Sequence, residues 1–164
     1  MQKILIIGNC GVGKTTFSKT LADKLNLPLV HLDYQYWKPD WSQPTKNDWR
    51  ATVKSLVSQK SWIIDGNYRS SFDLRVPAAD TIIFLDLPKN VALWRIIVRY
   101  LKNRGRNRSD IGGNNVEKID WTFIKRVLNY PRHHILHELN SYKTNQKLFH
   151  LRNQKDIKHF LRSL

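Results

Sequence analysis

The most specific chemical signature in the sequence is the glycine-rich stretch 8–15. It reads Gly-Asn-Cys-Gly-Val-Gly-Lys-Thr and matches the phosphate-binding pattern G-x-x-x-x-G-K-[ST] in full. Apolar residues 4–7 precede it, and residues 15–25 follow with the apolar spacing of a helix. In this strand–loop–helix context, the backbone N–H groups of the loop and the helix N-terminus face phosphate oxygens. The stretch therefore predicts a P-loop that binds a nucleoside triphosphate, which we take to be ATP.

The individual positions of this loop have separate roles. Gly11 and Gly13 allow backbone conformations and close approaches that a side chain would block. Lys14 is expected to bridge the outer phosphates, and the Thr15 hydroxyl is expected to ligate Mg²⁺. We expect the nucleotide to be bound by the loop and by the residue after it: Gly8, Asn9, Cys10, Gly11, Val12, Gly13, Lys14, Thr15 and Thr16.

Magnesium needs a second protein ligand, and two apolar runs in the sequence end in aspartate. These aspartates are Asp65 and Asp86. We favour Asp65 because Gly66 lets the chain turn sharply beside the phosphates. The alternative for each carboxylate is a structural role at a strand end or a helix cap.

Three further residues are candidates for the acceptor side. Asp33 follows a short apolar run, 29–32, and ligands of parallel sheets sit at the carboxyl ends of strands. Its carboxylate could take a proton from an acceptor hydroxyl during phosphoryl transfer, or it could be a solvated loop residue. Arg69 and Arg75 are candidates to hold an anionic part of the acceptor, with ordinary surface arginines as the alternative.

Basic residues cluster in the sequence after position 90. Arg95 and Arg99 share one face of the helix expected over 90–103, and no acidic residue occurs between positions 95 and 108. Because like charges repel, the cluster predicts an anionic ligand rather than a simple solvated face. We expect a basic lid over 104–115 whose closure excludes water. Arg95, Arg99 and Arg106 are assigned to the transferring phosphoryl group, and Arg104 and Arg108 to the nucleotide.

The remaining pattern predicts the architecture. Strands are expected over 4–7, 29–32, 62–66, 81–85 and 147–151, and helices over 15–25, 48–60, 90–103, 116–139 (bent at Pro131) and 156–164. This alternation predicts one α/β domain over 1–164 with a doubly wound parallel sheet and helices on both faces. The irregular segment 34–47 is expected to be an acceptor-side excursion. Its aromatic residues either stack on a base or sugar or pack the excursion onto the body: Tyr34, Tyr36, Trp37 and Trp41.

Composition narrows the partners and the compartment. The 164 residues have a net charge of +15, and the part after residue 90 contains 16 basic against 5 acidic residues. This excess predicts a polyanionic partner, which is a nucleotide, a nucleic acid or another phosphorylated ligand. A single cysteine fits a reducing compartment, and no apolar run reaches the ~20 residues that a membrane span needs. We therefore expect a cytoplasmic protein that does not cross a membrane.

Several of these motifs together resemble a known family. The P-loop, residues 31–33, the stretch 62–69, residues 81–86 and the segment 105–110 resemble those of the bacterial DNA topology modulation proteins, small P-loop proteins related to adenylate kinase. The resemblance implies a P-loop NTPase fold with strand order 2-3-1-4-5, a magnesium-side role for Asp65 and an acceptor-phosphate contact for Arg69. This chain has Asn67 and Tyr68 where adenylate kinases have Phe-Pro.

Two functional hypotheses follow. The leading one is a small P-loop kinase, a phosphotransferase that moves the γ-phosphoryl group of Mg-ATP to a small acceptor. A nucleoside monophosphate would attack with an ionised phosphate oxygen, whereas a nucleoside or another alcohol would benefit from a base such as Asp33. The second hypothesis is an ATP-binding protein that acts on, or is regulated by, nucleic acid. Binding of that kind should weaken steeply with salt.

Overall fold

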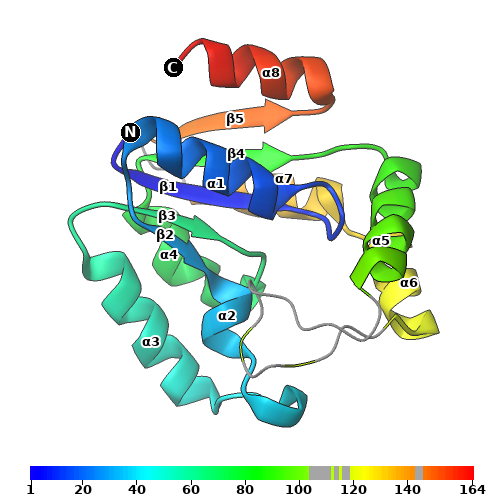
Figure 1. Ribbon diagram of the computed structural model, residues 1–164. Coiled ribbons are helices and arrows are strands. Elements are labelled where there is room, and N and C mark those ends of the chain that lie inside the picture. Colours follow the sequence, from blue (N-terminus) through cyan, green and yellow to red (C-terminus); the bar gives the residue numbers. More distant parts are fainter. Residues whose placement is uncertain (104–111, 113–114, 116–118, 143–145) are drawn as a thin grey trace.

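The protein is organised around one five-stranded parallel sheet. The computed structural model describes residues 1–103, 112, 115, 119–142 and 146–164. The strand order is β2-β3-β1-β4-β5, which confirms the order implied by the family resemblance (Figure 1). The strands are β1 (Lys3–Gly8), β2 (Leu29–His31), β3 (Trp62–Asp65), β4 (Thr81–Leu85) and β5 (Lys147–Leu151).

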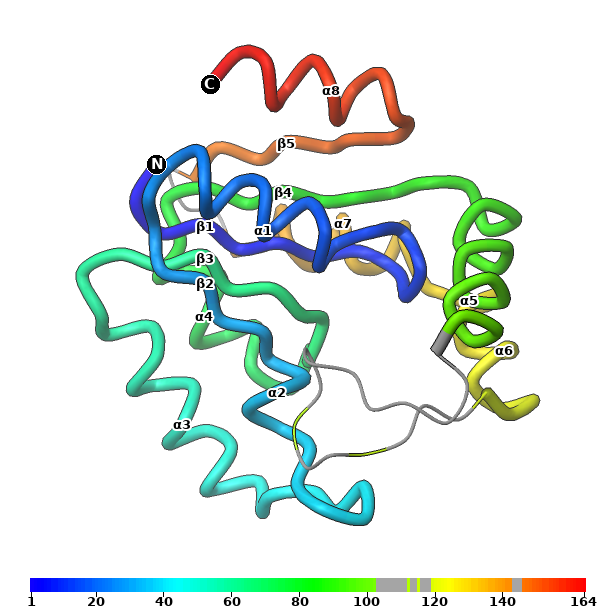
Figure 2. The backbone as a smooth tube through the Cα atoms, viewed as in Figure 1, coloured from blue at the N-terminus to red at the C-terminus, as the bar shows by residue number. Residues whose placement is uncertain are grey.

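Helices cover both faces of the sheet, as the sequence predicts. They are α1 (Lys14–Leu25), α2 (Leu32–Tyr36), α3 (Lys46–Ser58), α4 (Phe72–Ala78), α5 (Lys89–Asn103), α6 (Trp121–Leu128), α7 (Arg132–Ser141) and α8 (Gln154–Arg162), with short 3-10 turns η1 (Pro39–Trp41) and η2 (Arg69–Ser71). Figure 2 shows α5 and α6 side by side next to the turn between β1 and α1. Among the helices described, none is both long and apolar enough to cross a membrane.

The central strand explains why the sheet is buried on both faces. Successive side chains of a strand point to opposite faces, so β1 contributes Ile4 and Ile6 to one core and Leu5 and Ile7 to the other. The first core is completed by apolar residues of α1, α5, α6 and α8, and the second by those of α3, α4 and α7. A continuous apolar run is what a parallel strand covered on both faces requires.

The register of the sheet places chemically active residues together at one edge. In β1, Ile6 pairs with Asp65 of β3, and Gly8 pairs with Leu85 of β4. Asp65 and Asp86 therefore flank the start of the P-loop on opposite sides. Asp33 enters the same edge from α2, which follows β2 directly.

Some local expectations differ from the structure. The segment 34–47 contains most of α2 and the turn η1, and the helix α4 was not expected from the sequence. The helix expected over 116–139 is divided, where it is described, into α6 and α7. Residues 129–131, which end in Pro131, are not helical and separate the two. Helix α3 begins at Lys46, before the expected start at residue 48, because Thr45 caps it and its hydroxyl accepts from the Asp48 N–H.

Candidate active site

The P-loop has the backbone that phosphate binding requires. Gly11 and Gly13 have φ angles of 79° and 97°, which side chains rarely adopt. A Cβ atom on Gly11 would lie 2.4 Å from the carbonyl oxygen of Ala92 in α5, so this helix packs directly on the loop. Helix α1 begins at Lys14, and Gly13 before it provides no side-chain cap. The N–H groups of the first turn are thus left to bind an anion.

Hydrogen bonds to helices α5 and α6 fix the shape of the loop. The Asn9 amide is buried and donates to the Val127 carbonyl of α6 at 2.8 Å, while its oxygen accepts from the Cys10 N–H. Arg95 of α5 donates through Nη1 to the Val12 carbonyl at 2.8 Å. The Lys14 ammonium donates to the Asn9 carbonyl at 3.0 Å. It therefore lies over the loop that is expected to bind the phosphates.

Asp65 lies next to the helix that carries Thr15. Its carboxylate is 6% exposed, with Oδ2 3.1 Å from Nδ1 of His31 and 3.4 Å from Oγ of Ser18. The Ser18 hydroxyl also lies 3.0 Å from the Thr15 carbonyl and donates to it. One serine therefore joins the two residues expected to face the metal.

Asp86 occupies a different setting, on the β5 side of the P-loop. Its carboxylate accepts from Nε2 of His150 at 2.9 Å and lies 4.0 Å from the Arg132 guanidinium. Of the two aspartates, Asp65 contacts helix α1 through Ser18, and its choice as the metal ligand stays a prediction. Hydroxyl and carboxylate oxygens are the ligands that Mg²⁺ prefers, and it takes few of them from protein when phosphates supply the rest. In the described residues no cluster of three His, Cys, Asp or Glu could hold a metal ion by itself.

Asp33 is held in place by Tyr68. The Tyr68 hydroxyl donates to Oδ1 of Asp33 at 2.7 Å, and its ring packs against Tyr36 and Trp49 with centroid distances of 4.6 and 5.0 Å. Burial, together with the neighbouring charge of Asp33, raises the pKa of Tyr68. The phenol therefore stays protonated at neutral pH and remains a donor to the carboxylate. The backbone of Tyr68 has φ 22°, an unusual conformation outside glycine.

Arg75 differs from its expected place. Its side chain is fully buried and holds the turn after β3: Nη1 donates to the Gly66 carbonyl at 2.9 Å, and Nη2 donates to the carbonyls of Asn67 and Tyr68 at 2.7 and 2.8 Å. Burial lowers the pKa of Arg75 to about 9, so the group is still charged at pH 7. The expectation that Arg75 contacts an acceptor is replaced by a structural role in this turn.

Arg69 reaches across to helix α7. Its Nε and Nη2 atoms lie 2.9 and 2.8 Å from Oε2 of Glu138. Sequence reasoning gave Glu138 no role, because a separation of 69 positions offers no local signal for the pair.

The predicted lid is described only in part. Arg99 is half-buried on α5, whereas Arg104, Arg106 and Arg108 lie outside the described residues. Two described residues of the segment 104–115 contact the aromatic excursion. Asn115 is buried, donates to the Lys38 carbonyl at 2.9 Å and accepts from the Trp41 N–H at 2.9 Å, and a Cβ on Gly112 would lie 2.4 Å from the carbonyl oxygens of Tyr34 and Trp37.

The aromatic residues of the excursion pack largely on one another. The rings of Tyr36 and Trp49 are 4.9 Å apart, and those of Trp37 and Trp41 are 5.2 Å apart. Tyr34 is instead exposed. These contacts agree with the packing alternative for Tyr36, Trp37 and Trp41.

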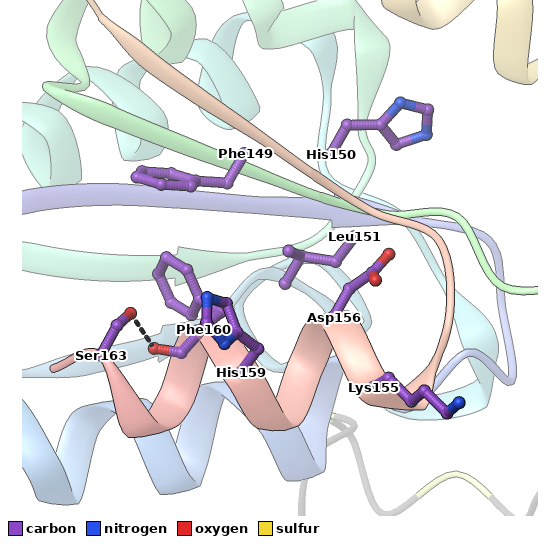
Figure 3. Close-up of a pocket in the computed structure, with 8 residues that line it drawn as sticks. All are labelled: Phe149, His150, Leu151, Lys155, Asp156, His159, Phe160 and Ser163. Carbon is purple, nitrogen blue, oxygen red and sulfur yellow. Dashed lines mark hydrogen bonds between the residues drawn. The ribbon is translucent and has the colours of Figure 1, made fainter.

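A shallow hollow lies between β5 and α8 and includes no residue of the P-loop. Figure 3 shows Leu151 and Phe160 between the strand and the helix, with His150 pointing away from α8, toward the side where it contacts Asp86. This hollow offers no chemistry comparable to that of the P-loop edge.

Comparison with known families agrees with the geometry of the loop. The model of the ATPase family associated with various cellular activities (AAA) matches residues 4–86, half of the chain. The chain belongs to this AAA family. The matched part runs from β1 through the P-loop to Asp86, and so contains both candidate metal ligands. Among curated proteins, no sequence matches significantly.

Solved structures of small kinases share the fold of this AAA-family chain. Shikimate kinase from Acinetobacter baumannii in complex with shikimate aligns with a TM-score of 0.63 and 15% identity, covering 99% of this chain and 90% of its own. Deoxyadenosine kinase from M. mycoides, with products dCMP and dCDP, gives 0.56 and 16% over 98% and 96%. Shikimate kinase from Bacteroides thetaiotaomicron gives 0.54 and 17% over 98% and 94%. At these identities the likeness shows a shared P-loop fold. It does not show the narrower topology modulation family, and it lends no support to a nucleic-acid partner.

Proposed function

We propose that the protein is an ATP-dependent phosphotransferase that moves the γ-phosphoryl group of Mg-ATP to a small acceptor. The observation that carries the proposal is the Tyr68–Asp33 hydrogen bond of 2.7 Å at the sheet edge where the P-loop opens. A carboxylate that a half-buried phenol holds at this edge could accept the proton of an alcohol acceptor.

The P-loop side of the proposal assigns roles to the chain's own residues. The N–H groups at the start of α1 bind the phosphate oxygens, and Lys14 leaves the Asn9 carbonyl to bridge the outer phosphates. Mg²⁺, held through Thr15 and Asp65, would neutralise charge on the phosphates. Ser18 keeps these two residues in register, since its hydroxyl contacts both.

The acceptor side completes the reaction. An acceptor oxygen forms a bond to the γ-phosphorus as the bond from that phosphorus to the β–γ bridging oxygen breaks, and ADP leaves with the electron pair. When the acceptor is an alcohol, its proton passes to the Asp33 carboxylate. Arg95, Arg99 and Arg106 are proposed to stabilise charge on the transferring group, with Arg104 and Arg108 on the nucleotide.

The names of the structural neighbours support a small acceptor. One neighbour is a shikimate kinase in complex with shikimate, and another is a deoxyadenosine kinase with dCMP and dCDP. A cytoplasmic location remains our prediction from the single cysteine.

The proposal is tested by ADP release from Mg-ATP in the presence of a panel of nucleosides, nucleoside monophosphates and small alcohols. We expect release to rise severalfold with at least one acceptor, and to fall at least ~100-fold in Lys14→Ala. Lys19→Ala, a lysine of α1 with no expected role, is the matched control. Equal ADP release with and without every acceptor would contradict the proposal.

A further inference from the structure

Arg69 is the residue best placed to attract an anionic acceptor, yet its charge is already neutralised. It follows Tyr68, which holds Asp33, and two of its nitrogens lie within 2.9 Å of one oxygen of Glu138. The arginine is 41% exposed and the glutamate only 24%. An acceptor phosphate or carboxylate would reach Arg69 only by displacing Glu138 or by lying against it.

Glu138 is held in position by the fold. Helix α7 packs on the sheet through Ile135 and Leu139, in the same core as Phe72 and Val76 of α4. Glu138 precedes Leu139 and therefore stands at the border of this core. A helix that packs on the sheet thus brings the carboxylate to Arg69 in η2.

The second arginine of this region cannot replace Arg69. The Arg75 guanidinium is fully buried, and its donors serve the carbonyls of the turn after β3 and the Ser71 hydroxyl. Turning it toward a ligand would leave buried carbonyls without partners, which is unfavourable.

The two acceptor-side carboxylates have different partners. Asp33 accepts from Tyr68, and Glu138 accepts from Arg69. A phosphate bound at Arg69 would face the Glu138 carboxylate beside an arginine whose charge is already compensated. An alcohol would instead gain a hydrogen-bond acceptor and a base.

From these contacts we infer that the acceptor is an alcohol without a phosphate or carboxylate near Arg69, and that Glu138 is a specificity-determining residue that excludes anionic acceptors. The inference rests on the proposed function and names the acceptor class of the same site. A nucleoside or a neutral polyol fits it, and a nucleoside monophosphate does not.

The test compares each nucleoside with its own 5′-monophosphate and compares glycerol with shikimate. Two quantities are measured: kcat/KM for transfer from Mg-ATP, and the Kd of the monophosphate when Mg²⁺ and a non-hydrolysable ATP analogue fill the P-loop. The variants are Glu138→Gln, the double variant Arg69→Gln/Glu138→Gln, and Asp23→Asn. Asp23 is an exposed residue of α1, so its substitution makes the same charge change away from Arg69.

We expect the wild type to prefer the neutral member of each pair. Glu138→Gln should tighten monophosphate binding about five- to tenfold, because an exposed Arg–carboxylate pair is weak and its loss frees the arginine for a doubly charged ligand. The double variant should lose this gain, and Asp23→Asn should match the wild type.

Two results would overturn the inference while leaving the proposed function intact. One is a wild type that transfers phosphate to monophosphates better than to their nucleosides. The other is a monophosphate Kd that is the same in wild type and Glu138→Gln. By contrast, failure of the wild type to bind Mg-ATP would contradict the proposed function itself.

Discussion

Replacing Arg75 by methionine should lower the free energy of unfolding, because this arginine holds the turn after β3 on the acceptor side of the molecule. The guanidinium makes hydrogen bonds of 2.7–3.1 Å to the carbonyls of Gly66, Asn67 and Tyr68 and to the Ser71 hydroxyl. Methionine keeps much of the length and apolar volume of the side chain but none of its donors. The three carbonyls would then lose a charged partner inside the protein.

The size of the effect follows from these contacts. A buried polar group left without its partner costs about 1–3 kcal/mol, and hydrogen bonds from charged groups are at the upper end. Two terms reduce the total: Tyr68 also accepts from Ser71, and removing the cation ends its desolvation penalty. We therefore expect a loss of about 3 kcal/mol in the free energy of unfolding, equivalent to a fall in Tm of roughly 6–12 °C for a chain of this size.

The assay is urea and thermal unfolding of wild type, Arg75→Met and Arg75→Lys, with Arg50→Met as control. Arg50 pairs with Asp73 at 2.6 Å on the surface, so its loss should change the free energy of unfolding far less than loss of Arg75. Arg75→Lys should be intermediate, since an ammonium cannot reach all the carbonyls that the planar fork reaches. Equal stability of Arg75→Met and Arg50→Met would refute the reasoning.

Three other substitutions test separate parts of the structure. Gly11→Ala should weaken ATP binding at least ~10-fold, measured by titration calorimetry, because its Cβ would meet the Ala92 carbonyl at 2.4 Å and φ is 79°; wild-type affinity would contradict this packing. Tyr68→Phe should lower kcat for an alcohol acceptor about tenfold with little change in the KM for ATP, since Asp33 loses its 2.7 Å donor; an unchanged kcat would remove Tyr68 from the mechanism. Asp80→Asn should lower the free energy of unfolding by about 1 kcal/mol at pH 7, because the side chain accepts from backbone N–H groups at the start of β1. Burial opposes ionisation of Asp80, yet these hydrogen bonds hold its pKa below the ordinary value of 3.8. Its contribution is therefore complete above that pH and is lost as pH falls through the lowered pKa, so urea unfolding at pH 7 and pH 2 should show the variant and wild type converging only at the lower pH.

Local sequence signals were sufficient for the P-loop and the sheet. The apolar runs that became β1, β3 and β4 are buried on both faces, and the loop pattern from Gly8 to Thr15 depends on neighbouring positions alone. Strand order came from the family resemblance, because spacing along the chain does not tell which strands pair.

The acceptor side was harder to predict because its contacts are distant in sequence. Arg69 and Arg75 look alike in the sequence, and only the fold separates a buried guanidinium that holds a turn from one that pairs with Glu138. Likewise, Asp33 was an open choice between a base and a solvated loop residue, and the Tyr68 hydroxyl that orients it comes 35 positions later.

The helices that were missed or misplaced show the same limit at short range. Helix α4 contains Pro77 and follows a turn held by Arg75, so tertiary contacts override a sequence that has little helical signal. Helix α3 begins at Lys46 because Thr45 and Asp48 bond to each other, a cap that the expected start at residue 48 did not anticipate.

The fate of the γ-phosphoryl group distinguishes a kinase from an ATPase most directly, and the family of this chain is named for ATPases. With γ-³²P-labelled ATP, Mg²⁺ and a panel of neutral alcohols, we predict that most of the label appears in a phosphorylated acceptor, and that Lys14→Ala abolishes the transfer. Label that accumulates only as inorganic phosphate, at a rate that no acceptor changes, would contradict the proposed phosphotransferase.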